Sequence, residues 1–211
     1  MAKLKELSVH PYIKDLFIPD GATKLIIGTI PPQRFCINHR SLLECDVDFY
    51  YGSFDNHFWK MMSCITNTKL VFNNTEEAKK QRKKILVDLK IGITDIVASC
   101  VHKGGRSDDA SLEKIEYSPL KELLEENTEI KKLLYTSEFV KKLINDYNKK
   151  NSCRSYHDVI DSKQRAYRAD IINNKDRLFD VTILYSPSPR GLGAEKIKAF
   201  QDQYIKAFGK D

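Results

Sequence analysis

Short apolar runs and longer amphipathic runs alternate along this chain. The short runs are rich in branched side chains and end at glycine, proline or polar residues, which is typical of strands buried on both faces of a sheet. They lie at residues 24–28, 91–99, 130–135 and 179–185. Their alternation with helical patterns predicts parallel strands joined by helices.

The longer runs carry apolar residues at helical spacing. Phe58, Met61, Met62 and Ile65 recur in this way, which predicts a helix with Asp55 as its N-cap. Four further helices are predicted at residues 76–89, 118–126, 138–149 and 194–208. The helix at 76–89 is basic on its outer side, which favours a solvent-facing surface there.

This order of elements predicts an α/β fold: a three-layer α/β/α sandwich with a central, mainly parallel four-stranded sheet, in a single domain spanning residues 1–211. Ligands of such sheets bind beyond the carboxyl ends of the strands. We therefore expect the loop at 28–32, the end of the second run at Ser99 and the loop at 186–189 to share one rim. The polar stretch 151–176 is the one candidate insertion.

Composition narrows the class of protein. Hydrophobic residues make up 41% and charged residues 30% of the chain, and no stretch approaches the roughly 20 apolar residues of a membrane span. The N-terminus lacks a signal-peptide core, so we expect a cytoplasmic protein with no membrane partner. The five cysteines lie far apart without a CxxC pair, which predicts reduced thiols in or near the core, no metal site and no cofactor.

A net charge of +6 is compatible with a polyanionic partner. Cations concentrate at residues 78–84 and 163–177, although such runs are also common on solvated helix faces. Charge by itself therefore identifies no partner.

Four segments now match one pattern in order: GTIPP at 28–32, FYYGSFDNHFW at 49–59, IGITDIVASCVHKGGRSDDASL at 91–112 and YSPSPRG at 185–191. Together they resemble the uracil-DNA glycosylase superfamily, and within it most closely the hypoxanthine-DNA glycosylase branch, with the mismatch-specific uracil glycosylases next. The resemblance implies a DNA glycosylase of base-excision repair. We expect it to be monofunctional, because the matching motifs place no lysine as a Schiff-base nucleophile, and to be a monomer. Its substrate would be a deaminated or damaged base, uracil or hypoxanthine, flipped out of DNA.

The resemblance also implies a catalytic residue. Other branches place a catalytic Asn or Asp in the first loop, where this chain has Ile30. In the hypoxanthine-type branch an Asn of the aromatic segment is the proposed replacement, and here that residue is Asn56. Its amide can position water and donate to a departing base. Asp55 is the alternative, since a carboxylate can activate water and stabilise positive charge on the sugar, although an N-cap role competes.

The base pocket and the DNA-binding loop follow from the same resemblance. It implies base contacts from Gly28, Thr29, Ile30 and Pro31, with Tyr51 stacking on the base. The last motif would hold phosphates through serine hydroxyls and backbone amides, with Arg190 adding charge and Leu192 acting as an apolar wedge. The residues implied in that loop are Ser186, Pro187, Ser188, Pro189, Arg190 and Leu192.

Several positions depart from the family pattern. Ser53 and Phe54 stand where relatives commonly have His-Pro, and Pro32 replaces a glycine and removes a backbone donor. These departures, with Ile30, leave open a second function: a catalytically inactive nucleic-acid-binding protein of the same fold. A hydrolase of small esters or nucleosides is a third class, but the chain carries no Gly-x-Ser-x-Gly elbow, Walker loop or dinucleotide fingerprint.

Overall fold

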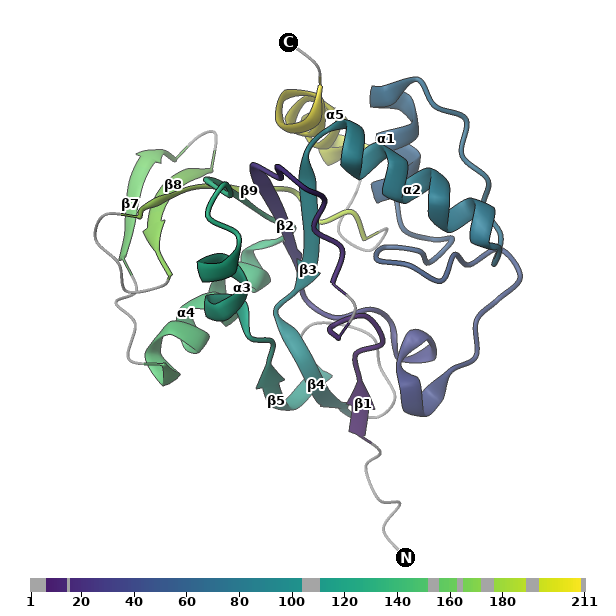
Figure 1. Cartoon of the computed structure of the whole chain (residues 1–211), viewed down its shortest axis with the longest axis horizontal. Coiled ribbons are helices and arrows are strands. Elements are labelled where there is room, and N and C mark those ends of the chain that lie inside the picture. The colour runs from purple at the N-terminus through teal and green to yellow at the C-terminus, as the bar shows by residue number, and fades with distance from the viewer. Residues whose placement is uncertain are drawn as a thin grey trace, which may run out of the picture.

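The computed structural model describes residues 7–14, 16–103, 111–151, 156–162, 165–171, 177–188 and 194–209. At its centre lies a six-stranded sheet in the order β3-β2-β6-β9-β8-β7 (Figure 1). Neighbouring strands pair in parallel from β3 through β2 and β6 to β9, as the sequence pattern predicts. These four are β3 (Ile91–Asp95), β2 (Lys24–Gly28), β6 (Lys132–Tyr135) and β9 (Phe179–Ile183).

Two antiparallel strands extend this sheet beyond β9. They are β8 (Ala166–Asp170) and β7 (Tyr156–Asp161), and they come from the polar stretch that the sequence marks as an insertion. The predicted four parallel strands are therefore present, and the sheet is two strands wider than expected. The polar and charged sequence of this stretch hid its strand character, because polar residues are less frequent in strands than branched and aromatic ones.

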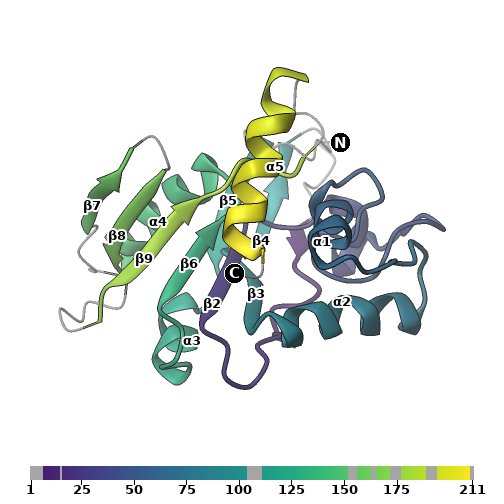
Figure 2. The ribbon, with the colours of Figure 1, turned by 90° about the horizontal axis from the view of Figure 1, so that it is seen from above.

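Helices cover both faces of the sheet. Leu25 and Ile27 of β2 point to one face, where they pack with α3 (Leu120–Glu126) and α4 (Glu138–Lys150). Ile26 points to the opposite face, which α1 (Phe58–Thr66), α2 (Glu76–Asp88) and α5 (Ala194–Phe208) cover (Figure 2). Because β2 is buried on both faces, every residue of its run except the first is enclosed, and the three-layer sandwich is confirmed.

The predicted strand 91–99 is wrong in one respect, because the chain changes sheets at Ile96. β3 ends at Asp95, and β4 (Val97–His102) joins a second, antiparallel sheet between β1 (Leu7–Val9) and β5 (Leu112–Tyr117). The backbone N–H groups of Ile96 and Val97 donate to Gly28 and Thr29, so the chain follows the first loop before it turns away. An unbroken apolar run does not reveal such a switch, since both strands are buried.

The N-cap prediction for Asp55 is also wrong. α1 begins at Phe58 with His57 as its N-cap residue, and Asp55 is exposed in the turn before it. A hydrogen bond from Asn56 N–H to Ser53 O (2.9 Å) forms that turn, and Asn56 Oδ1 accepts the N–H of Phe58 (2.8 Å). Where a side chain does cap, Thr75 and Ser137 accept N–H groups at the starts of α2 and α4.

The thiols follow the prediction only in part. Cys36 and Cys100 are buried, whereas Cys45 and Cys64 are exposed, and Cys153 lies outside the described residues. No helix in the described part of the chain is long and apolar enough to cross a membrane.

Candidate functional site

Three segments that are distant in sequence meet at the carboxyl edge of the parallel strands. Gly28 ends β2, Asp95 ends the neighbouring β3, and Tyr51 reaches them from the aromatic loop. A Cβ atom at Gly28 would lie 2.1 Å from Asp95 Oδ1 and 2.3 Å from the Tyr51 hydroxyl oxygen. A side chain cannot fit there, so glycine is required for the close approach of these two polar atoms to the backbone.

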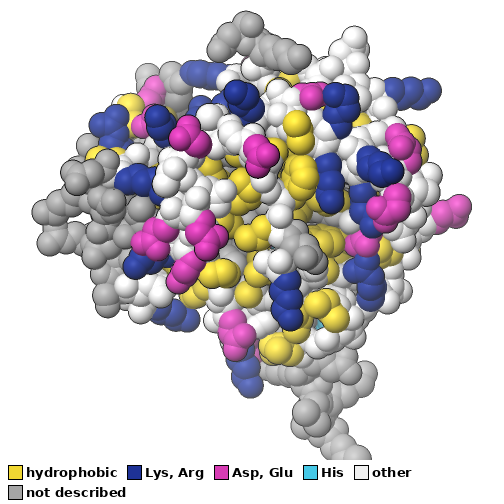
Figure 3. All heavy atoms as spheres, in the orientation of Figure 1, with side chains coloured by type: hydrophobic (Ala, Val, Ile, Leu, Met, Phe, Trp, Pro, Cys, Tyr) yellow, Lys and Arg dark blue, Asp and Glu magenta, His cyan; other side chains and the backbone are white. Residues whose placement is uncertain are grey.

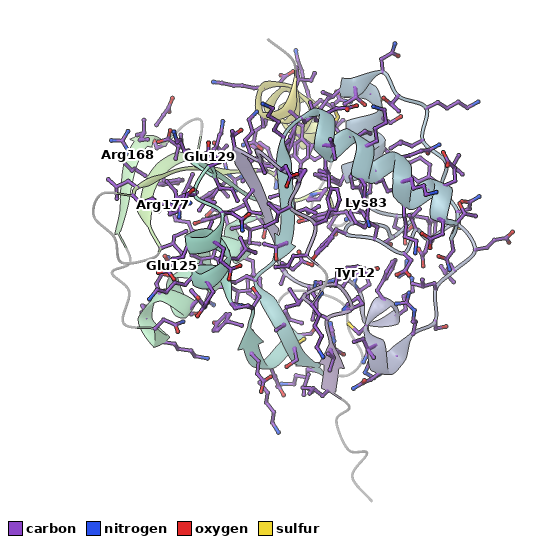
Figure 4. All side chains as sticks on the ribbon, in the orientation of Figure 1. Tyr12, Lys83, Glu125, Glu129, Arg168 and Arg177 are labelled. Atoms are coloured by element: carbon purple, nitrogen blue, oxygen red, sulfur yellow. The ribbon has the colours of Figure 1, made fainter. Side chains whose placement is uncertain are left out.

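Asp95 is held in place by His10, a residue of the N-terminal segment. His10 Nε2 lies 2.8 Å from Asp95 Oδ2, and both side chains are almost fully buried. His10 Nδ1 accepts the backbone N–H of Tyr12 (3.0 Å), whose side chain is labelled in Figure 4. A backbone N–H can only donate, so Nδ1 carries no proton and Nε2–H is the group that faces Asp95.

Tyr51 is fixed on several sides. Its hydroxyl donates to Thr136 Oγ1 (3.1 Å), and Thr136 in turn donates to Ile27 O (3.3 Å). Its ring stacks on Phe58 at 4.6 Å between centroids, and its φ of 55° lies in the left-handed region. Burial, and next the charge of Asp95, raise the pKa of Tyr51 well above its ordinary value, so the phenol stays protonated. One face of the ring is already covered by Phe58.

An ion pair shapes the aromatic loop. Arg34 binds Asp46 through two hydrogen bonds (2.8 and 2.9 Å) and donates to Ser53 Oγ (2.8 Å). Asp46 also accepts the N–H groups of Leu43 and Phe54. Burial would raise the pKa of the Asp46 carboxyl, but the hydrogen bonds from Arg34 and the two backbone groups outweigh it and lower that pKa. Ser53 and Phe54, which depart from the family pattern, are thus integrated into the loop.

Asn56 lies two residues before the first residue of α1. It is partly buried, and its Oδ1 is oriented by the N–H of Phe58, while its Nδ2 donates to no group among the described residues. The neighbouring N–H of His57 donates to Pro187 O (2.9 Å), which joins this turn to the loop after β9. Burial and the nearby charge of Lys60 lower the pKa of His57, so its ring is neutral at neutral pH.

The loop after β9 is anchored to α5. The side-chain amide of Gln203, on α5, accepts the N–H of Tyr185 (2.6 Å) and donates to Ile183 O (2.9 Å). It thus pairs with the backbone at the end of β9 much as a neighbouring strand would. Pro187 is buried, and Ser186 Oγ accepts the N–H of Ser188 (3.3 Å). Pro189, Arg190 and Leu192 lie outside the described residues.

Arg165 supplies a cation at this loop. It is the residue before β8, with its guanidinium over the ring of Tyr185 (4.8 Å) and 3.1 Å from Glu138. Its side chain is 19% exposed, which leaves it accessible to an anion at the rim. A second cationic surface lies on α2, where lysines are mixed with acidic side chains (Figure 3) and Lys83 stands over the ring of Phe17.

Much of the first loop, residues 28–32, packs against the rest of the protein. Ile30 packs against the core between the sheet, α3 and α4, and Pro31 is buried, while Thr29 and Pro32 are partly exposed. Ser99 was predicted to end a strand at the carboxyl edge. This prediction is wrong, because Ser99 lies within β4, and Asp95 is the residue at the end of β3. Trp59 is buried, and its Nε1–H donates to Tyr50 O (2.7 Å).

Other features of the molecule offer less chemistry. Burial raises the pKa of Cys36 to about 12 and that of Cys100 to about 11, so neither is a thiolate near neutral pH. Within the described ranges, no group of three or more His, Cys, Asp or Glu side chains could hold a metal ion. A hollow of about 440 Å³ between the C-terminal ends of α1 and α5 is lined by none of the residues described at the carboxyl edge of the sheet.

Sequence reasoning missed His10, Asp95, Thr136 and Arg165. Asp95 did carry a signal, since it is the only charged residue in the apolar run 91–99. A carboxylate at that point either ends the strand or serves a site. The other three are ordinary polar residues in sequence, and only the path of the chain brings them to the carboxyl edge.

Comparison with known proteins bears on the fold. No protein-family model matches the chain, and no curated protein is significantly similar to it in sequence. Among solved structures, it is similar to a solution NMR structure from Methanosarcina acetivorans that is described as a putative uracil DNA glycosylase. The TM-score is 0.58 at 14% identity, and the match covers 96% of this chain and 97% of that one. This likeness establishes a shared fold over nearly the whole chain.

Proposed function

We propose that this chain is a monofunctional DNA glycosylase that hydrolyses the N-glycosidic bond of a deaminated or damaged base, uracil or hypoxanthine, flipped out of DNA. The observation that carries the proposal is the meeting of the first loop, the aromatic loop and the loop after β9 at one edge of the sheet. Gly28 contacts Tyr51, and His57 binds Pro187. The fold shared with a protein described as a uracil DNA glycosylase supports the same reaction.

Asn56 is the catalytic residue in this proposal. Cleavage of the bond develops positive charge on the sugar and negative charge on the departing base. The hydrogen bond from Phe58 N–H uses one lone pair of Asn56 Oδ1, so the second lone pair and the Nδ2 donors remain for water and the base. The N-terminus of α1 follows directly and presents its positive end to the anionic base.

Asp55 is the weaker candidate. Its side chain is exposed, and water screens the field of an exposed carboxylate before it reaches a buried sugar. Asn56, by contrast, is partly buried and its amide orientation is fixed.

DNA would be held at the rim through its phosphates, without recognition of the base sequence. Ser186 and Ser188 offer hydroxyl and backbone groups to phosphates, and Arg165 adds a positive charge beside them. Pro189, Arg190 and Leu192 complete this loop in the proposal, with Leu192 filling the gap left by the base.

A catalytically inactive DNA-binding protein of the same fold is the second candidate. It is favoured by Ile30, which packs into the core where other branches of the superfamily carry a polar catalytic group. The two functions differ only in the chemical step.

An excision assay separates them. The unmodified protein is incubated with single- and double-stranded oligonucleotides that carry uracil, hypoxanthine, xanthine or no lesion, and abasic product is measured. We expect excision of at least one deaminated base, in EDTA as well as without it, and no adduct trapped by borohydride, since a monofunctional enzyme uses water as nucleophile. Binding to DNA without any product would leave the inactive binder as the function.

A further inference from the structure

Phe54 is the exposed aromatic residue of the aromatic segment, residues 49–59, all of which the structure describes. It is 37% exposed, whereas the other aromatic residues of this segment are buried or partly buried. A single exposed ring is ordinary on a protein surface. What distinguishes Phe54 is the rigidity of its backbone and its place beside Asn56.

The backbone on both sides of Phe54 is fixed. Its N–H donates to Asp46 Oδ1 (3.1 Å), and the preceding Ser53 Oγ accepts a hydrogen bond from Arg34 (2.8 Å). After it, the N–H of Asn56 donates to Ser53 O (2.9 Å) and closes the turn. Asp46 itself is buried and paired with Arg34. A ring presented by such a turn loses little conformational entropy when it binds, which favours a role in recognition.

Phe54 lies next to the proposed catalytic group. Two residues of chain span at most about 7 Å, so the backbone of Phe54 is within that distance of Asn56. Successive nucleotides of a DNA strand rise by about 3.4 Å. The hydrogen bond from His57 N–H to Pro187 O (2.9 Å) places the turn beside the phosphate-binding loop, so a strand held by that loop runs past the turn. With Asn56 at the flipped nucleotide, Phe54 reaches the nucleotide next to it.

The chemistry of the turn suits a base and not a phosphate. Its two exposed residues are Phe54 and Asp55, an aromatic ring and a carboxylate. The carboxylate repels a phosphate, whereas the ring offers an apolar face on which any base can stack. The cation beside the turn, Arg34, is paired with Asp46, so its charge is largely balanced. The phosphates would therefore lie against the loop after β9, with a neutral base against Phe54.

We propose that Phe54 stacks on the base that adjoins the flipped nucleotide in the same strand. The contact builds on the proposed function, because it needs a nucleotide that has left the stack. Flipping removes one stacking partner from the adjoining base, and the Phe54 ring replaces it, which stabilises the open form of the DNA. Stacking recognises no hydrogen-bond pattern, so the contact adds affinity for a damaged site without a sequence requirement.

Stacking can be measured on DNA that needs no excision. The probe is a duplex that carries a tetrahydrofuran abasic analogue, with 2-aminopurine on its 5′ side, on its 3′ side or opposite it. The fluorescence of 2-aminopurine falls when this base stacks. We expect the unmodified protein to quench the probe at one of the two neighbours in the damaged strand, and Phe54→Ala to lose this quenching. The probe in the opposite strand should respond equally to both proteins.

Affinity gives a second readout. Loss of one base–aromatic stack should weaken binding to the tetrahydrofuran duplex by about tenfold or more at a fixed salt concentration. A single-stranded oligonucleotide with the same analogue should show the same loss, because the adjoining base lies in the same strand. Binding to an undamaged duplex should change much less, since its bases are all stacked and its phosphates supply the affinity.

Matched variants separate stacking from other effects. Phe54→Trp keeps a ring and should retain quenching and affinity, whereas Phe54→Leu keeps only an apolar side chain and should behave like Phe54→Ala. Val87→Ala truncates an exposed side chain near the end of α2 and should bind and quench like the unmodified protein. Melting temperatures of all variants should agree, because both side chains are exposed.

The outcomes separate this contact from the proposed function. Phe54→Ala that keeps quenching and affinity overturns the contact, and so does a Phe54-dependent signal from the opposite strand alone. Phe54→Leu that binds like the unmodified protein also overturns it, since any apolar side chain would then serve. A protein that shows Phe54-dependent quenching but excises no base overturns the glycosylase reaction alone. A protein that binds none of these oligonucleotides overturns both.

Discussion

The backbone N–H of His57 donates to the carbonyl oxygen of Pro187 over 2.9 Å. This hydrogen bond connects the turn that carries Asn56 with the loop that follows β9, although 130 residues separate the two in sequence. In the proposed function, a flipped base and the phosphates that flank it would be held by one connected unit. Because the hydrogen bond joins two backbone groups, the spacing between the proposed catalytic and phosphate-binding groups does not depend on the side chain of His57.

Replacing Asn56 with alanine should greatly slow excision of the base. The Asn56→Ala variant loses both the oriented carbonyl and the amide donors, so we expect the single-turnover rate of excision to fall by about a hundredfold or more. DNA binding, measured by fluorescence anisotropy, should change little, because the phosphate contacts lie on another loop.

Asp55→Asn is the matched control for that variant. Asp55 is exposed and does not cap α1, so the substitution should leave both the excision rate and the melting temperature close to those of the unmodified protein. If Asn56→Ala remains active and Asp55→Asn is inactive, the catalytic group is the carboxylate.

Arg165 should contribute to DNA affinity through charge. Arg165→Ala removes the cation at the Tyr185 loop, and we expect weaker binding to all sequences alike and a salt dependence reduced by about one counterion. Titrations at several salt concentrations measure both effects. Arg168→Ala is the control, because Arg168 lies within β8, where it also pairs with a carboxylate, Asp180, but is 51% exposed (Figure 4). Equal effects of the two substitutions would argue against a specific role for Arg165.

Gly28→Ala should destabilise the protein by about 1–3 kcal/mol, the usual cost of an added methyl group in a packed interior. The new Cβ would overlap Asp95 Oδ1 and the Tyr51 hydroxyl, and neither can move freely because His10, Thr136 and Phe58 hold them.

Urea unfolding measures the cost, with Gly92→Ala on the adjacent strand as reference. The nearest atoms to a Cβ at Gly92 would be side-chain carbons of Leu25 and Ile18 at 3.1–3.3 Å, so the loss of stability in Gly92→Ala should be smaller. A larger loss at Gly92 would mean that the contact at Gly28 relaxes easily.

The Asp46 carboxyl should contribute to acid sensitivity. Its pKa is lowered in the folded state, so its stabilising effect is fully present above the unfolded value near pH 4 and is lost as the pH falls through the folded value. Asp46→Asn should cost about 3 kcal/mol at pH 7, because Arg34 loses its partner.

Unfolding curves collected at several pH values should show the gap between Asp46→Asn and the unmodified protein closing as the pH falls below 4. A gap that stays constant over this range would show that the pKa of Asp46 is the same in the folded and unfolded states.

The sequence by itself determined the layers of this protein. Each buried parallel strand is an unbroken apolar run and each covering helix repeats its apolar residues, so local periodicity predicts the four central strands, the helices and the order of the segments at the carboxyl edge. The positions of Gly28 and Pro187 were also readable, because each comes at or after the end of a predicted strand, whereas Tyr51 and Asn56 were expected only from the resemblance of the aromatic segment.

Only the tertiary structure decided which polar groups face one another. His10 and Asp95 are 85 residues apart, and Tyr51 meets Thr136 across the same separation. The switch of sheets at Ile96 and the start of α1 at Phe58 are likewise invisible in the apolar pattern. Hydrophobic periodicity reports whether a residue is buried, which is a property of its own element. A hydrogen bond between distant residues depends on the path of the whole chain, and burial alone does not encode that path.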